Sequence, residues 1–186
     1  MYKIYSNMHL FLMQKKEDFM LKEVLKTDVD LSAIGEDALS LYLSGDFNCA
    51  ESVTYTIRKH IDPTMPEGFI AACTGFGMGV GGSKCMCGSV TGGVVCLGYF
   101  FGRKTPTTLT DPSSQKTLTL AKELYDYFKE NHGSLCCHVH LKKLEHGTSQ
   151  QRQSCGNFVK EVAIKIAQIV IREKGGGKNV AKRSLS

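Results

Sequence analysis

CMCGSVTGGVVCLGYFFG, residues 85–102, contains no charged side chain, and five of its 18 residues are glycine. A helix that crosses a bilayer needs about 20 mainly apolar residues. This stretch is at the short limit for such a span, and Ser89 and Thr91 add polarity. We therefore predict a buried helix over residues 84–101 and no membrane span. Gly88 and Gly92 stand one helical turn apart, a spacing that lets a second helix pack closely against this one.

The segments on both sides of this stretch also have the apolar spacing of helices. In residues 31–44, for example, Ile34, Ala38, Leu41 and Tyr42 fall on one face of a period of 3.6. No segment has the sustained alternation of a β-strand. The sequence therefore predicts an all-α fold, a single compact bundle of about five helices with the glycine-rich helix at its centre. The predicted helices cover residues 31–44, 46–60, 84–101, 111–131 and 154–173.

Three regions follow from this pattern. Residues 31–173 form the helical domain with the cysteines, and residues 1–30 form a poorly defined N-terminal extension in which Met20 is a second candidate for the initiating methionine. Residues 174–186 contain three consecutive glycines followed by basic residues, and we expect a flexible basic tail there.

Composition and charge exclude several classes of protein. The net charge is only +5, and no run of five or six basic residues occurs, so nucleic-acid binding is not indicated. The apolar patch at residues 9–13 is too short for a signal peptide and is followed by charged residues. We therefore expect a cytoplasmic protein whose eight cysteines are reduced rather than a secreted disulfide framework.

Three cysteines lie near predicted helix starts. Cys49 follows the predicted cap Asp46, Cys155 directly follows Ser154, and Cys87 falls in the first turn of the glycine-rich helix. Free backbone N–H groups at a helix start favour a thiolate, which is the form that binds metals and carries redox chemistry. A single buried cysteine is more often a small apolar residue. Cys73 and Cys96 fit that description, because both stand in apolar stretches.

The remaining cysteines have weaker spacings. Cys85 and Cys87 form a C-x-C pair and Cys136 and Cys137 are adjacent, whereas the stronger C-x-x-C spacing is absent. If the site holds a metal, Cys85, Cys136 and His138 are further candidate ligands. Residues 77–82 match G-x-G-x-x-G, but no acidic residue follows at the spacing of a dinucleotide fold, so a tight turn is expected there.

Four of these segments together resemble the C_GCAxxG_C_C family of redox-active proteins. Asn48-Cys49-Ala50 resembles the family's opening motif, and Cys87-Gly88-Ser89-Val90-Thr91-Gly92 resembles its central motif with serine in place of alanine. Cys137, the better match of the vicinal pair, and Cys155 with Val159 resemble the later motifs. The resemblance covers residues 36–172. It implies a small prokaryotic protein in which Cys49, Cys87, Cys137 and Cys155 form a redox site. His138 stands where the family frequently has arginine.

Two chemical functions and one structural function stay open at this point. Four thiols are the right number of ligands for an iron–sulfur cluster, and with it or another metal the protein would transfer electrons. Alternatively, the same four cysteines cycle between dithiol and disulfide in a metal-free oxidoreductase. In the third reading the protein is a helical binding module with structural cysteines. The electron carrier and the oxidoreductase both require a redox partner protein or a small-molecule electron carrier. A homo-oligomer is compatible with all three functions.

Overall fold

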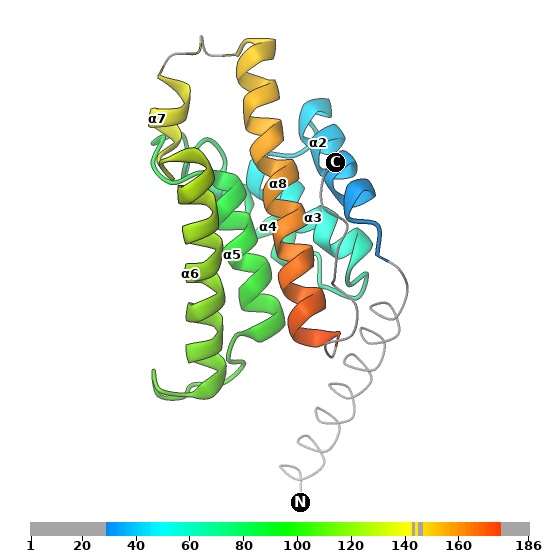
Figure 1. Ribbon diagram of the computed structural model, residues 1–186, viewed down its shortest axis with the longest axis vertical. Coiled ribbons are helices and arrows are strands. Elements are labelled where there is room, and N and C mark those ends of the chain that lie inside the picture. Colours follow the sequence, from blue (N-terminus) through cyan, green and yellow to red (C-terminus); the bar gives the residue numbers. More distant parts are fainter. Residues whose placement is uncertain (1–28, 143, 145–146, 176–186) are drawn as a thin grey trace, which may run out of the picture.

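The computed structural model describes residues 29–142, 144 and 147–175, and these residues form helices joined by turns, with no strand among them. Five helices have twelve or more residues, as the sequence predicts for an all-α bundle (Figure 1). They are α2 (Leu31–Ser44), α3 (Cys49–His60), α5 (Gly88–Phe101), α6 (Pro112–His132) and α8 (Ser149–Lys174). Shorter elements are α4 (Gly68–Ala71), a 3-10 turn (Thr74–Phe76) and α7 (Cys137–Leu141). Nearly all of the predicted extension and tail lies outside the described residues.

Capping side chains set most helix ends. Asp30 accepts hydrogen bonds from the first turn of α2, and Gly45 ends that helix with a φ of 88°. The predicted start of α6 is confirmed, because Asp111 caps it and Pro112 is its first residue. The predicted cap Asp46 of α3 is wrong. Asn48 caps that helix in a reciprocal pair with Glu51, whereas Asp46 instead accepts a hydrogen bond from Ser44.

The start of the last helix also differs from the prediction. Helix α8 begins at Ser149 and is capped by Thr148, five residues before the predicted start at Ser154. Its first turns, residues 149–153, are all polar, so they carry none of the apolar periodicity on which the prediction depended. Cys155 therefore lies inside a helix and not at its first turn.

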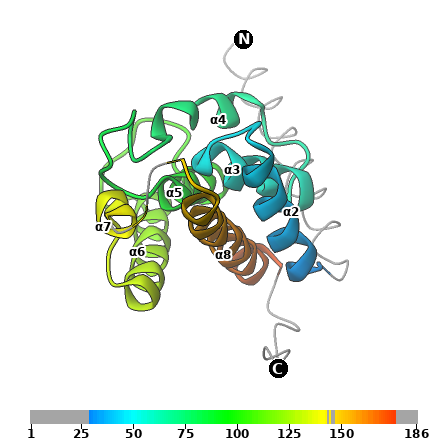
Figure 2. The same cartoon turned by 90° about the horizontal axis from the view of Figure 1, so that it is seen from above.

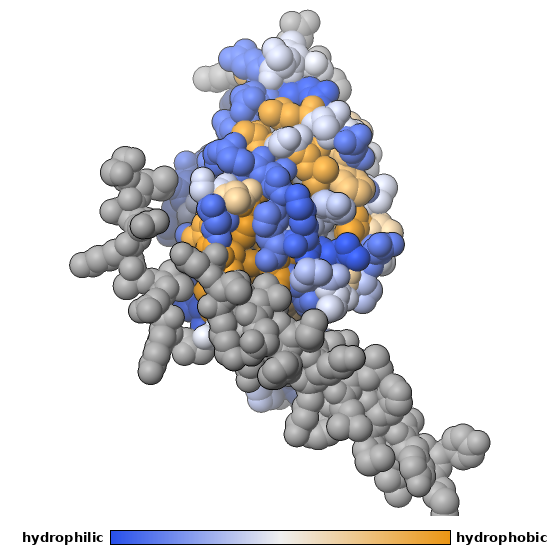
Figure 3. Space-filling model, turned by 90° about the vertical axis from the view of Figure 1, so that its right-hand side faces the viewer, coloured by the Kyte–Doolittle hydropathy of each residue, from blue (hydrophilic) through white to orange (hydrophobic). Residues whose placement is uncertain are grey.

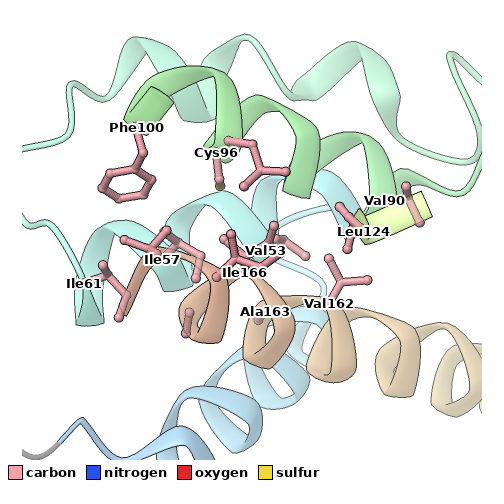
Figure 4. Packing of buried hydrophobic residues seen from close by; sticks show 14 of the residues in the cluster. Val53, Ile57, Ile61, Val90, Cys96, Phe100, Leu124, Val162, Ala163 and Ile166 are labelled. Atoms are coloured by element: carbon pink, nitrogen blue, oxygen red, sulfur yellow. The ribbon is translucent and has the colours of Figure 1, made fainter. Parts of the chain in front are cut away.

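Helix α8 holds the bundle together. It packs against α2, α3 and α5, and seen from above it lies with α2 on one side and α5 and α6 on the other (Figure 2). The core between these helices contains Val53, Ile57, Cys96 and Ile166 (Figure 4). On the face shown in Figure 3, hydrophilic side chains surround apolar patches. Some apolar side chains therefore lie at the surface and not in this core.

Helices α3 and α5 approach each other more closely than two helices with ordinary side chains could. A Cβ atom on Gly92 would stand 2.5 Å from the backbone oxygen of Ala50, and one on Gly88 would stand 2.2 Å from the sulfur of Cys49. The close approach predicted from the spacing of these glycines is therefore present. Helix α5 starts at Gly88 and not at the predicted residue 84, which makes Cys87 its N-cap residue.

The segment before α5 has an unusual backbone. Four residues other than glycine, Met78, Val80, Lys84 and Met86, have φ between 54° and 60°, a left-handed conformation that is rare for β-branched or bulky residues. Gly79, Gly81 and Gly82 share that conformation. The predicted tight turn therefore includes residues other than glycine in the left-handed conformation. Met78, Val80 and Met86 are also among the exposed large apolar side chains.

Candidate functional site

Four cysteines lie together where three helices begin. Cys49 is the first residue of α3, Cys87 caps α5, and Cys137 is the first residue of α7. The thiol of Cys155 reaches the same place from α8, six residues after that helix begins. We call Cys49, Cys87, Cys137 and Cys155 the four-cysteine cluster. Three thiols at helix starts were predicted, but the third is Cys137 and not Cys155.

The electrostatic effects among these thiols indicate that they lie close to one another. Burial raises the pKa of Cys49 to about 12, and negative charge on Cys87, Cys155 and Cys137 raises it as well. Burial also raises the pKa of Cys137 to about 11, again with contributions from Cys87 and Cys155. Cys87 likewise raises the pKa of Cys155, so Cys87 acts on each of the other three members of the cluster. Four neighbouring thiols therefore oppose one another's ionisation.

Hydrogen bonds to two of the sulfurs partly offset this rise in thiol pKa. The Oγ of Ser89 lies 3.1 Å from the sulfur of Cys87, and the backbone N–H groups of Ser89 and Val90 also lower the pKa of that thiol, which burial raises. The backbone N–H of Met78, in the left-handed segment, lowers the pKa of Cys49. The start of α5 and the preceding segment thus supply donors to two sulfurs of the cluster.

Tyr42 on α2 is a site residue that the sequence did not reveal. Its side chain hydrogen-bonds to Cys155 and lowers the pKa of that thiol, which burial raises. The pKa of Tyr42 is itself raised, first by burial and then by the charges of Cys155 and Cys49. Tyr42 falls on the apolar stripe of its helix, so the periodicity alone marks it only as a packing residue. The phenol O–H is the donor to a thiolate at that sulfur.

The other cysteines fall into two groups. Cys73 and Cys96 are fully buried away from the cluster, on either side of the Thr54 hydroxyl, at 3.2 Å and 3.8 Å. Their predicted place in the core is confirmed. Cys85 is exposed and Cys136 is half-buried. His138 is also exposed, and its backbone N–H donates to the carbonyl oxygen of Lys84.

The donor atoms fit soft-metal chemistry in kind and number, since thiolates are the ligands of iron–sulfur clusters and of zinc. Within the part of the chain that the structure describes, however, no group of three or more His, Cys, Asp or Glu residues is placed to hold a metal ion. A single ion needs its sulfur ligands about 2.3 Å from one point. In a four-iron cluster each cysteine sulfur binds a different iron, so the sulfurs stand further apart than around a single ion. The ligand roles of Cys85, Cys136 and His138 stay predictions.

Removing the hydroxyl of Ser89 is expected to raise the pKa of Cys87. In Ser89→Ala the sulfur loses its side-chain donor but keeps the two backbone donors, so its thiolate becomes less stable. The measurement is the alkylation rate of Cys87 against pH, followed by peptide mass spectrometry. Thr91→Val is the matched control, because the Thr91 hydroxyl bonds to the Gly88 carbonyl oxygen and not to sulfur. An unchanged pH profile in Ser89→Ala would show that the hydroxyl does not stabilise the thiolate.

The raised thiol pKa values also predict how stability depends on pH. The thiols of the unfolded chain lose protons near pH 9.0, whereas Cys137 and Cys49 in the fold keep theirs to about pH 11 and about pH 12. The unfolded state therefore binds fewer protons in this window, and the free energy of unfolding falls as the pH rises through it. We expect a loss of about 1–2 kcal/mol per thiol between pH 9 and 10.5.

The measurement is urea unfolding of the reduced, metal-free protein at a series of pH values. Cys49→Ala removes one of the strongly shifted thiols, so its stability should fall less steeply with pH than that of the parent. This comparison cancels the titration of lysine and tyrosine side chains elsewhere. Equal slopes for the two proteins would contradict the shift assigned to Cys49.

The described residues define an all-α fold with a cluster of four thiols, two of them buried and two half-buried. The chain belongs to the C_GCAxxG_C_C family, whose model bears the description "Putative redox-active protein (C_GCAxxG_C_C)" and matches residues 47–169. The resemblance seen in the cysteine motifs is thereby confirmed. No curated protein matches the chain, and no solved structure does either. Among the described helices none is both long and apolar enough to cross a membrane.

Proposed function

We propose that the protein transfers electrons through an iron–sulfur cluster, or another thiolate-bound metal, held by Cys49, Cys87, Cys137 and Cys155. The observation that carries this proposal is the convergence of four thiols where α3, α5 and α7 begin, in which Cys87 adds to the effect of burial by raising the pKa of each of the other three. Four thiolates in one buried place repel one another unless a cation lies among them. A bound centre of this kind would supply one-electron transfer.

The chain's own residues would tune such a site. Ser89 and two backbone N–H groups donate to the sulfur of Cys87, and Tyr42 donates to Cys155. Hydrogen bonds to ligand sulfurs and exclusion of solvent are two of the means by which a protein sets a reduction potential. Cys87 and Cys137 are 7% and 9% exposed, so water has little access to their side chains.

A metal-free dithiol–disulfide oxidoreductase is the second candidate. Two observations favour it: the described residues hold no group placed for a single metal ion, and among the thiol charges that raise the pKa of Cys49, that of Cys87 has the largest effect. Against it stands the protonation of these thiols. An exchanging thiol reacts as the thiolate, most effectively when its pKa is near the ambient pH, whereas burial raises the pKa of Cys49 to about 12.

Either chemistry needs a second molecule to exchange electrons with the cluster. We propose a redox partner protein or a small-molecule electron carrier in a reducing cytoplasm, where free thiols persist. Whether the protein acts as an enzyme or as a carrier depends on that molecule.

The test is purification without oxygen, followed by measurement of iron, acid-labile sulfide and visible absorbance. The proposal expects iron and sulfide in amounts that match one centre per chain and a charge-transfer band that bleaches on reduction. The matched control is Cys73→Ser, which alters a cysteine outside the cluster and should keep the centre. If the protein contains no metal while free-thiol counting finds thiols of the cluster oxidised in pairs, the oxidoreductase replaces the electron carrier.

A further inference from the structure

We propose that Cys85 and Cys136 form a second, outer redox site, a dithiol that is oxidised reversibly to a disulfide by a low-molecular-weight disulfide. These two cysteines lie outside the four-cysteine cluster. The proposal does not depend on whether that cluster binds a metal, because it concerns different sulfurs and a different reaction.

Two hydrogen bonds hold the segments of these cysteines side by side. The N–H of Cys87 donates to the carbonyl oxygen of Leu135 over 2.7 Å, and the N–H of His138 donates to the carbonyl oxygen of Lys84 over 2.9 Å. Residues 84–87 and 135–138 therefore run antiparallel. Cys85 and Cys136 both stand between the two bonds, so the backbones at these two positions are held near each other.

A third contact brings the sulfur of Cys136 to the backbone next to Cys85. That sulfur lies 3.6 Å from the carbonyl oxygen of Lys84, whose peptide bond leads directly into Cys85. From standard backbone dimensions the sulfur of Cys136 is then at most about 6.5 Å from the Cα of Cys85. A disulfide needs the two Cα atoms to be usually 4.4–6.8 Å apart. The contact places the sulfur of Cys136 beside the backbone of Cys85, and formation of the disulfide requires that side-chain rotation and a backbone adjustment bring the two sulfurs together.

Solvent access separates Cys85 from the four-cysteine cluster. Cys85 is exposed and Cys136 is half-buried, whereas the members of the cluster are half-buried (Cys49 and Cys155) or buried (Cys87 and Cys137). A dissolved disulfide can therefore reach Cys85 before it reaches any thiol of the cluster.

The reaction balances as ordinary thiol–disulfide exchange. One outer thiolate attacks a sulfur of the small disulfide, forms a mixed disulfide and releases one small thiol. The second outer cysteine then attacks the protein-side sulfur of the mixed disulfide and releases the other small thiol. In sum the protein loses two protons and two electrons, and the small disulfide gains both.

The experiment uses the purified, fully reduced protein in mixtures of reduced and oxidised glutathione of increasing oxidised fraction. After alkylation of the remaining thiols, peptide mass spectrometry identifies each cysteine as free, linked to glutathione or linked to another cysteine. We expect a peptide cross-linked between Cys85 and Cys136 that disappears on return to reducing conditions. In Cys85→Ser, Cys136 should instead be found alkylated or linked to glutathione.

Two further variants separate this proposal from the proposed function. Cys87→Ser removes a member of the cluster but should keep the outer disulfide, and Cys73→Ser, a buried cysteine elsewhere, should keep it too. The proposal is overturned if Cys85 and Cys136 stay alkylated throughout the series. The proposal is also overturned if Cys85 forms its disulfide with Cys137. The same holds if a non-reducing gel shows that Cys85 forms only disulfides between two chains.

Discussion

Replacing Gly92 by alanine is expected to lower the free energy of unfolding by about 3 kcal/mol, near the upper end of the usual cost of overpacking. The new Cβ would stand 2.5 Å from the backbone oxygen of Ala50 and 2.9 Å from its Cα. Backbone atoms cannot rotate away as a flexible side chain can, so α3 and α5 would have to separate. Thermal unfolding should show a decrease in Tm of roughly 6–12 °C.

Gly98→Ala is the control for this variant, because it lies in the same helix but no atom stands within 4 Å of its would-be Cβ. There alanine should stabilise the protein by up to about 1 kcal/mol, since glycine is the poorer helix former. If Gly92→Ala were as stable as the parent, the two helices would not be in contact at that position.

The second large effect is expected in Cys87→Ser, which should lose its redox centre or its thiol reactivity, with affinity for a bound metal reduced on the order of 100-fold or more. Cys87 acts on Cys49, Cys137 and Cys155, and it is the one member of the cluster whose sulfur receives a hydroxyl donor and two backbone donors. The measurement compares iron, sulfide and absorbance with those of the parent protein after purification without oxygen.

Cys96→Ser is the matched control, because it makes the same chemical change in the core. It should lower stability by roughly 1–3 kcal/mol if the new hydroxyl is left unpaired and should keep the full redox signal. The assignment of site and core would be reversed if Cys96→Ser lost the signal without unfolding while Cys87→Ser kept it.

The sequence was a reliable guide for two helices in which the cap lies directly before the apolar stripe. Cap and stripe were both present at Asp111-Pro112, where the start of α6 was predicted correctly, and in α2, whose predicted bounds match. The first turns of α8 were missed because residues 149–153 are polar and only Thr148 signals the start. The start of α5 was placed too early because the left-handed residues Lys84 and Met86 have no sequence signature apart from the glycines before them.

The sequence identified candidate site residues but left their chemistry open. The apolar stretches around Cys73 and Cys96 were enough to predict their place in the core, whereas Cys137 was predicted only from the resemblance to the family. Tyr42 could not be found in this way, because its contact with Cys155 joins two helices that are far apart in the sequence. The hydroxyl of Ser89 was visible as a departure from alanine in the central motif, but its bond to the sulfur requires the cap geometry of α5.

The left-handed segment before α5 also holds conformational strain. Met78, Val80, Lys84 and Met86 each hold a backbone conformation that costs an ordinary residue roughly 1 kcal/mol or more. The N–H of Met78 reaches Cys49 from inside that segment. Whatever occupies the four thiols must either keep these residues in their conformation or let them relax. An occupant that lets them relax gains the released energy as affinity, so the loop favours ligands that reshape it over those that leave it unchanged.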